Sequence, residues 1–222
     1  MNERITTYLD EVYSFPHAVG SIFEPVVFVY TILVILLLAV VGVMVICGCY
    51  EVASVQFPST GLYSMLILYL VVAVGEEVLC RGIMFRMLDE RWGFHAALVI
   101  SALIFGFMHY GNPNSTVWSC TAIAIESGLM FGVAYKLSGS LWVPIGIHWA
   151  WNFTQGNILG FSVSGTAEGP SVITPLIHGP ELLTGGGFGA EASIIATLLG
   201  TLITIWLYYK YYKIKHDNEK VL

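Results

Sequence analysis

A long apolar run from Val26 to Cys49, with no charged side chain, sets the strongest limit on how this chain can fold. A helix of about 20 apolar residues is enough to cross the hydrocarbon core of a bilayer. Only 11% of the 222 residues are charged, whereas a soluble domain has about 25%. The sequence therefore predicts an all-α, polytopic membrane helix bundle. The net charge of −6 provides no basic stripe, which excludes nucleic acid as a partner.

Five further apolar segments follow the first one. We expect about six transmembrane helices, over residues 26–49, 62–78, 94–109, 117–135, 141–159 and 194–209. Polar segments separate them: a lead-in over 1–24, an amphipathic interfacial segment over 81–92, loops over 50–61, 110–116 and 160–190, and a tail over 210–222. Since the chain shows no internal repeat or linker, we interpret 1–222 as a single membrane domain.

The positions of the lysines and arginines predict the topology. With six spans, one side of the membrane receives Arg81, Arg86, Arg91, Lys136, Lys210, Lys213, Lys215 and Lys220. The loops on the other side, 50–61, 110–116 and 160–190, contain neither residue type. Because lysine and arginine are enriched in cytoplasmic loops, we expect both termini in the cytoplasm of a multi-pass, integral membrane protein.

Two adjacent carboxylates and an arginine end the second apolar run. A charged side chain near the centre of a membrane helix costs about 2.5–3.5 kcal/mol, so it persists only when it is paired or used. Glu77 and Arg81 are four residues apart and share a helix face, where they can pair. Glu76 is rotated by about 100° from Glu77. We therefore interpret Glu77 and Arg81 as a structural pair and Glu76 as free for chemistry.

Polar side chains also mark two later spans. His109 follows Phe105 by one turn, and His148 and Asn152 share one face of the fifth span. Hydrogen bonds between membrane helices contribute only about 0.6 kcal/mol on average. Helix packing alone is therefore a weak reason to keep an imidazole or an amide inside the membrane. Together with Glu76, these residues supply a carboxylate base, two imidazoles and an amide. The combination favours attack of water on an amide carbonyl.

The three motifs EExxxR, FxxxH and HxxxN, in this order on successive spans, resemble the CAAX prenyl endopeptidase and bacteriocin-processing family of intramembrane proteases (CPBP, or Abi). The resemblance covers about residues 62–159, and the runs 152–156 and 184–189 look like bacterial members. It implies that Glu76 is the general base, with His109 beside it. His148 and Asn152 would bind the oxyanion, and Glu77 and Arg81 would support the site.

The resemblance also implies the partners. The substrate would be a membrane protein or a lipidated peptide, prenylated as in the family's name, or another peptide as in bacterial members. The location would be a bacterial or archaeal cell membrane. Family members commonly have further N-terminal helices, so the cavity of this shorter chain is either more open or completed by a homodimer.

The use of a metal stays open at this point. Glu76, His109 and His148 could ligate zinc with an open fourth position, but the sequence has no HExxH pair. The same three side chains could instead hold water directly. No other cofactor is indicated.

Other features and functions also leave alternatives. Glu126 is either a protonated carboxyl that is hydrogen-bonded to Ser127 or to a neighbouring helix, or a second polar group that lines the cavity. Gly128 and Gly132 predict a close helix contact, which we expect inside the fold. Loop 160–190 is long for a connector and could cap the cavity. A non-proteolytic self-immunity or scaffold protein is the alternative function, whereas a transporter is disfavoured because the chain lacks two related halves.

Overall fold

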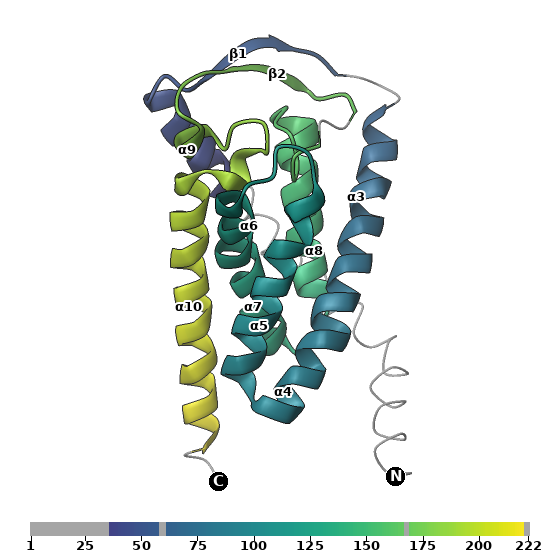
Figure 1. Cartoon of the computed structure of the whole chain (residues 1–222), viewed down its shortest axis with the longest axis vertical. Helices are drawn as coiled ribbons and strands as arrows, with labels where there is room; N and C mark the ends of the chain where they lie inside the picture. The colour runs from purple at the N-terminus through teal and green to yellow at the C-terminus, as the bar shows by residue number, and fades with distance from the viewer. Residues whose placement is uncertain (1–35, 58–60, 167–168, 220–222) are drawn as a thin grey trace.

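The computed structural model describes residues 36–57, 61–166 and 169–219. These residues are mostly helical, and the long helices run along the longest axis of the molecule (Figure 1). After the helix Leu36–Ile46, the helical elements are α3 (Gly61–Glu77), η1 (Val78–Phe85), α4 (Arg86–Trp92), α5 (Phe94–Phe107), η2 (Met108–Gly111), α6 (Val117–Ile123), η3 (Ala124–Gly128), α7 (Leu129–Ser138), α8 (Trp142–Phe153), η4 (Thr154–Ile158), α9 (Glu181–Thr184), η5 (Ala190–Ala192) and α10 (Ile194–Glu219). The helical class predicted from the sequence is confirmed.

Four of the described helices are long and apolar enough to cross a membrane: Gly61–Trp92, Phe94–Gly111, Val117–Ser138 and Ile194–Asp217. The predicted interfacial segment 81–92 is not a separate element, because α3, η1 and α4 form one continuous helix. The first predicted span lies partly outside the described residues, and α8 with η4 is too short to be among the four. The total of six spans and the cytoplasmic termini stay predictions.

A two-stranded antiparallel sheet covers one end of the bundle (Figure 1). It pairs β1 (Tyr50–Val55) with β2 (Ile173–Ile177), and its register is irregular between Val52 and Ser54. The sequence analysis interpreted both segments as loops, and the sheet corrects that interpretation. Pro175 is compatible with β2 because each strand of a two-stranded sheet has a free edge.

Tyr50 fastens the sheet to the helices below it. Its hydroxyl donates to the Leu159 carbonyl oxygen at 2.8 Å. Its ring stacks on Phe161, with centroids 5.2 Å apart. Both partners immediately follow the helix α8–η4, so the sheet and the segment after α8 form one connected end of the molecule, which we call the sheet end.

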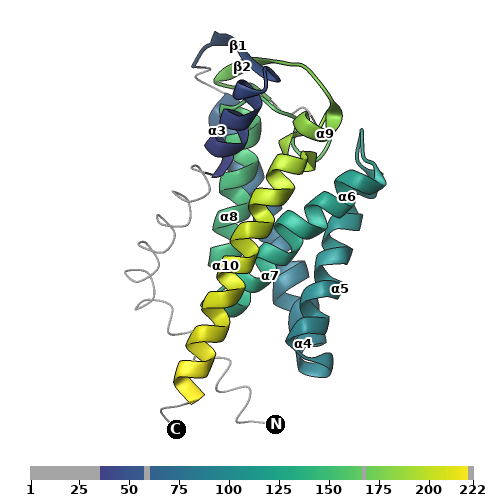
Figure 2. The same ribbon diagram turned by 90° about the vertical axis from the view of Figure 1, so that its left-hand side faces the viewer.

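Glycines allow the helices around the site to pack closely. A Cβ on Gly106 would lie 2.3 Å from the Cys120 carbonyl oxygen, and one on Gly128 would lie 2.9 Å from the Cα of Ala102. Helix α5 therefore packs backbone to backbone against α6 and η3, which lie beside it in Figure 2. The internal contact predicted for Gly128 is confirmed.

Candidate active site

The buried ion pair of the site lies within one continuous helix, and its arginine contacts two others. Glu77 and Arg81 are both 0% exposed, and Arg81 Nη1 donates to Glu77 Oε1 at 2.8 Å. Arg81 Nη2 donates to the Gly128 carbonyl oxygen at 3.1 Å, and its guanidinium lies 4.3 Å from the centre of the Phe105 ring. The arginine thus connects η1 with η3 and α5, and it stabilises the packing of these helices next to the site.

Glu76 points away from this pair and towards two histidines. Its Oε2 lies 3.9 Å from His109 Nε2 and 3.9 Å from His148 Nε2. This oxygen is buried, and it has no hydrogen-bond partner among the described residues. Both distances are too long for a direct hydrogen bond. An unpartnered buried carboxylate oxygen is costly, so its position between two imidazoles suggests a functional role.

The hydrogen bond of His109 determines which ring nitrogen carries the hydrogen. Its Nδ1 lies 2.9 Å from the Phe105 carbonyl oxygen, which can only accept. Nδ1 is therefore the donor, and in the neutral ring Nε2 presents a lone pair towards Glu76. The Phe105 ring packs edge-on against the imidazole, with centroids 5.4 Å apart. His109 is thus oriented as an acceptor that faces the carboxylate.

His148 is held by the ion pair itself. Its Nδ1 lies 3.1 Å from Glu77 Oε1, the oxygen that also accepts from Arg81. Because this carboxylate accepts both bonds, His148 Nδ1 carries a hydrogen. Donation from Nε2 then requires the imidazolium form.

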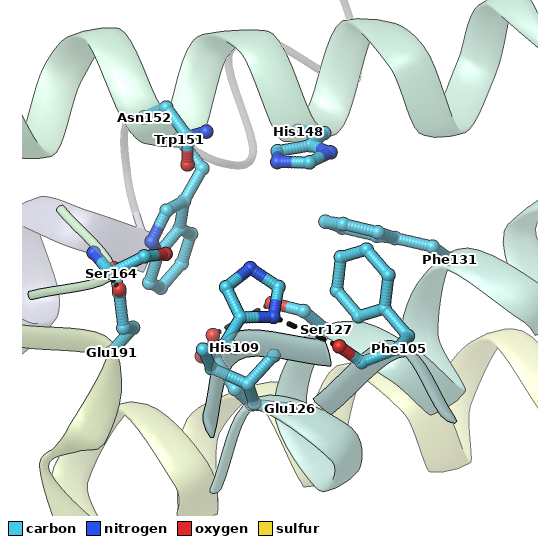
Figure 3. Close-up of a pocket in the computed structure, with 11 residues that line it drawn as sticks. Phe105, His109, Glu126, Ser127, Phe131, His148, Trp151, Asn152, Ser164 and Glu191 are labelled. Atoms are coloured by element: carbon cyan, nitrogen blue, oxygen red, sulfur yellow. Dashed lines mark hydrogen bonds between the residues drawn. The ribbon is translucent and has the colours of Figure 1, made fainter. Parts of the chain in front are cut away.

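A cavity of about 280 Å³ opens beside these groups. Asn152 lies one turn after His148 on α8, and both side chains project from this helix towards His109 (Figure 3). The cavity is lined by Tyr69, Val72, Glu76, Met108, His109, Asn112, His148, Asn152, Val163, Ser164 and Thr166. The structure thus brings Glu76, His109, His148 and Asn152 to one cavity. Glu77 and Arg81 are buried next to it, where Glu77 contacts His148.

A second, smaller cavity of about 20 Å³ lies behind His109 and His148, which is enough for one water. Glu126 lines it and is 1% exposed (Figure 3). Ser127 Oγ donates to Glu126 Oε1 at 2.7 Å. Both interpretations of Glu126 therefore describe part of its environment, since it bonds to Ser127 and also lines a cavity next to the site.

Glu191, which the sequence analysis did not single out, fixes a segment that lines the cavity beside Glu76. It is 3% exposed and accepts hydrogen bonds from the Ser164 backbone N–H and from Gln155 Nε2. Asn112 Nδ2 donates to the Ser164 carbonyl oxygen at 2.9 Å. Ser164 has a φ of 49°, a left-handed conformation that is uncommon outside glycine. These bonds hold the segment 161–166, so part of loop 160–190 does line the cavity.

Burial raises the pKa of Glu191 to about 7, although hydrogen bonds from Ser164 and Gln155 lower it. As pH rises from about 4.5 to about 7, the unfolded chain loses this proton before the folded protein does, so stability should fall by up to about 3 kcal/mol. We expect Glu191→Gln to remove this dependence. Thermal unfolding in detergent at pH 5 and pH 8 measures it, and parallel pH profiles for wild type and variant would contradict it.

The distances from Glu76 to His109 and His148 test the zinc site for which the sequence analysis named these three residues. Two ligand atoms about 2.1 Å from a tetrahedral zinc lie about 3.4 Å apart. Glu76 Oε2 lies 3.9 Å from each imidazole Nε2, which is wider. In the part of the chain that the structure describes, no group of three or more His, Cys, Asp or Glu side chains could hold a metal ion. We therefore derive no step through a metal.

Three of the helices around the site change to π-helix next to their functional residues. Element η1 begins directly after Glu77, η3 contains Glu126, and η4 follows Asn152 by two residues. Short π-helical segments inside α-helices occur frequently at functional sites. Their presence next to Glu77, Glu126 and Asn152 supports the assignment of this region as the active site.

The fold and this cavity define a helical membrane protein with a carboxylate–imidazole site inside its bundle. Residues 58–154 match the family model described as Type II CAAX prenyl endopeptidase Rce1-like. This range holds all six predicted site residues, and the match confirms the resemblance inferred from the motifs. Comparisons with curated proteins and with solved structures gave no match.

Proposed function

We propose that this protein is an intramembrane endopeptidase that hydrolyses a peptide bond in a membrane-associated polypeptide. The observation that carries the proposal is the unpartnered Oε2 of Glu76, which faces two imidazole nitrogens at 3.9 Å beside a cavity. A polar separation of this length commonly contains a bridging water. The family match supports a CAAX-type protease in general.

Activation of water follows from the two acceptors. A water between Glu76 Oε2 and His109 Nε2 donates one hydrogen to each, which leaves a lone pair for attack on the substrate carbonyl. Glu76 takes a proton as the new carbon–oxygen bond forms. It then gives this proton to the leaving amine as the carbon–nitrogen bond breaks. No covalent enzyme intermediate is needed.

The opposite side of the cavity stabilises the oxyanion. We assign this role to the Nε2–H of the His148 imidazolium and to the side-chain amide of Asn152, which share one face of α8. Glu77 positions His148 through its Nδ1 at 3.1 Å. Donors fixed in this way need little rearrangement when charge develops on the substrate oxygen.

The test is cleavage of quenched peptides, prenylated and plain, by the purified protein in detergent or in vesicles. The proposal expects cleavage of at least one peptide class. Preference for the prenylated peptides would assign the substrate chemistry that the family's name describes. A folded protein that binds these peptides and cleaves none of them would favour the self-immunity or scaffold alternative.

Removal of an oxyanion donor should slow cleavage without unfolding the protein. We expect Asn152→Ala to lower kcat by about 10²–10³ with little change in KM, because the lost bond forms only as charge develops. Asn114→Ala, an exposed amide outside the main cavity, is the matched control. If Asn152→Ala raised KM alone, the residue would bind substrate instead.

Chelation should leave the rate unchanged, because the proposed steps use only side chains and water. The measurement is the cleavage rate before and after dialysis against EDTA, with a zinc protease treated in parallel. A rate that fell with EDTA and recovered with added zinc would assign Glu76, His109 and His148 as metal ligands.

A further inference from the structure

We propose that the active-site cavity opens to the extracytoplasmic face of the membrane, so that the substrates are peptide segments presented from that face. This inference rests on the proposed function for its substrate class, but the sidedness of the cavity can be measured by itself. Three observations carry it: the closed floor of the cavity, its open rim, and the distribution of charge between the two ends of the bundle.

Buried side chains close the cavity towards the end of the bundle that holds α4. Below Glu76, the interior is filled by Arg81, Phe85, Phe105 and Phe131, none of them more than 2% exposed. Arg81 lies against both of the last two rings. A polypeptide therefore has no path to Glu76 through this packed layer.

The rim of the cavity consists of turns at the opposite end. Asn112 follows α5, and Val163, Ser164 and Thr166 belong to the segment after η4. Glu76 lies midway along the continuous helix Gly61–Trp92, and the other α3 residues that line the cavity are on its Gly61 side. In Figure 1 this side of α3 leads to the sheet end. The cavity thus extends from the middle of the bundle towards the sheet end.

Charge distinguishes the two ends. The described segments at the sheet end, 47–57, 110–116 and 159–166 with 169–193, contain no lysine or arginine. Away from that end, Arg86 and Arg91 lie on α4, Lys136 lies in the last turn of α7, and three lysines follow residue 209 on α10. Because lysine and arginine mark the cytoplasmic side, the α4 end is cytoplasmic and the cavity faces outward.

The orientation limits what the enzyme can cut. A chain segment that enters from the sheet end has already crossed the membrane or leaves it there. The inference therefore favours exported peptides and the outer segments of membrane proteins over cytoplasmic C-termini. The acidic residues at the sheet end, which include the exposed Glu51 and Glu181, would favour substrates with positive charge near the cleavage site.

The experiment is labelling of single cysteines with a membrane-impermeant maleimide, in a background in which exposed Cys47 is replaced by serine. Met108→Cys and Thr166→Cys report on the cavity. His178→Cys, after β2, reports on the sheet end, and Ser138→Cys, at the end of α7, reports on the α4 end. All variants are expressed in cells and assayed as intact cells and as inverted vesicles.

We expect the two cavity cysteines and His178→Cys to react in intact cells, and Ser138→Cys to react only in inverted vesicles. Cavity cysteines that react together with Ser138→Cys would overturn the proposal. So would a reversed pattern of the two end positions, or cavity cysteines that react from neither side while His178→Cys does.

A second measurement separates this inference from the proposed function. Quenched peptide is added outside right-side-out and inverted vesicles that carry wild type or Glu76→Ala. Glu76-dependent cleavage in right-side-out vesicles alone supports both proposals, and cleavage in inverted vesicles alone overturns the sidedness. If labelling gives the expected sidedness but neither vesicle type shows Glu76-dependent cleavage, the proposed function fails and the sidedness stands.

Discussion

Glu76→Gln should lower the rate of peptide cleavage by about 10²–10⁴, the usual contribution of a general base. The amide has nearly the same shape as the carboxylate but cannot take a proton from water. Its carbonyl oxygen can still accept a hydrogen bond in the position that Oε2 occupies between the two imidazoles. We therefore expect kcat to fall while substrate binding and thermal stability stay close to wild type.

The matched control is Glu90→Gln, which makes the same change at an exposed position on α4. It should leave cleavage and stability unchanged. If Glu76→Gln cleaved as fast as Glu90→Gln, Glu76 would not be the base. If cleavage were absent from wild type but a cellular immunity function survived Glu76→Gln, the scaffold alternative would replace the protease.

The sequence was informative where the chemistry depends on spacing along one helix. The i, i+4 relation of Glu77 to Arg81 placed them on one face, and the structure shows them 2.8 Å apart. The same reasoning turned Glu76 away from the arginine. His148 and Asn152 were likewise assigned to one face of a span. Helical periodicity alone determines these relations, so no knowledge of neighbouring helices was needed.

Contacts between segments far apart in the chain could not be predicted from helical periodicity. Glu191 and Ser164 are 27 residues apart and meet only because the segment after α8 folds back over the cavity. The pairing of β1 with β2 is another example, since the two strands lie more than 100 residues apart. One signal was present: three of the five residues in the run Ile173–Ile177 are β-branched, and β-branched residues are enriched in strands.

The interfacial segment predicted over 81–92 shows a different limit. Its charges, read by themselves, indicated a helix at the membrane surface. Arg81 is instead fully buried, because Glu77 and the Gly128 carbonyl oxygen satisfy its guanidinium. The continuous helix follows from this burial, since Arg81 must remain inside the bundle to pair. The hydrogen-bond partners of Arg81, one on its own helix and one on η3, thus decided that this charge lies in the core and not at the surface.

Arg81→Met should be the most destabilising of the substitutions considered, by about 3–5 kcal/mol, because it leaves the buried Glu77 carboxylate without its cation. The second oxygen of Glu77 already has no partner among the described residues, and Glu77 is 0% exposed. Thermal unfolding in detergent measures the effect. Arg91→Met, at an exposed position on α4, is the control and should change stability little.

The double variant Glu77→Gln/Arg81→Met separates the structural role of the pair from its role in catalysis. Removing both charges should recover much of the lost stability, since neither member of the Glu77–Arg81 pair is left as an uncompensated buried charge. Cleavage should stay low, because His148 then lacks the carboxylate that accepts its Nδ1 hydrogen. Equal unfolding temperatures for Arg81→Met and Arg91→Met would show that the pair contributes nothing to stability. Full recovery of cleavage in the double variant would show that His148 supports cleavage without the Glu77 carboxylate.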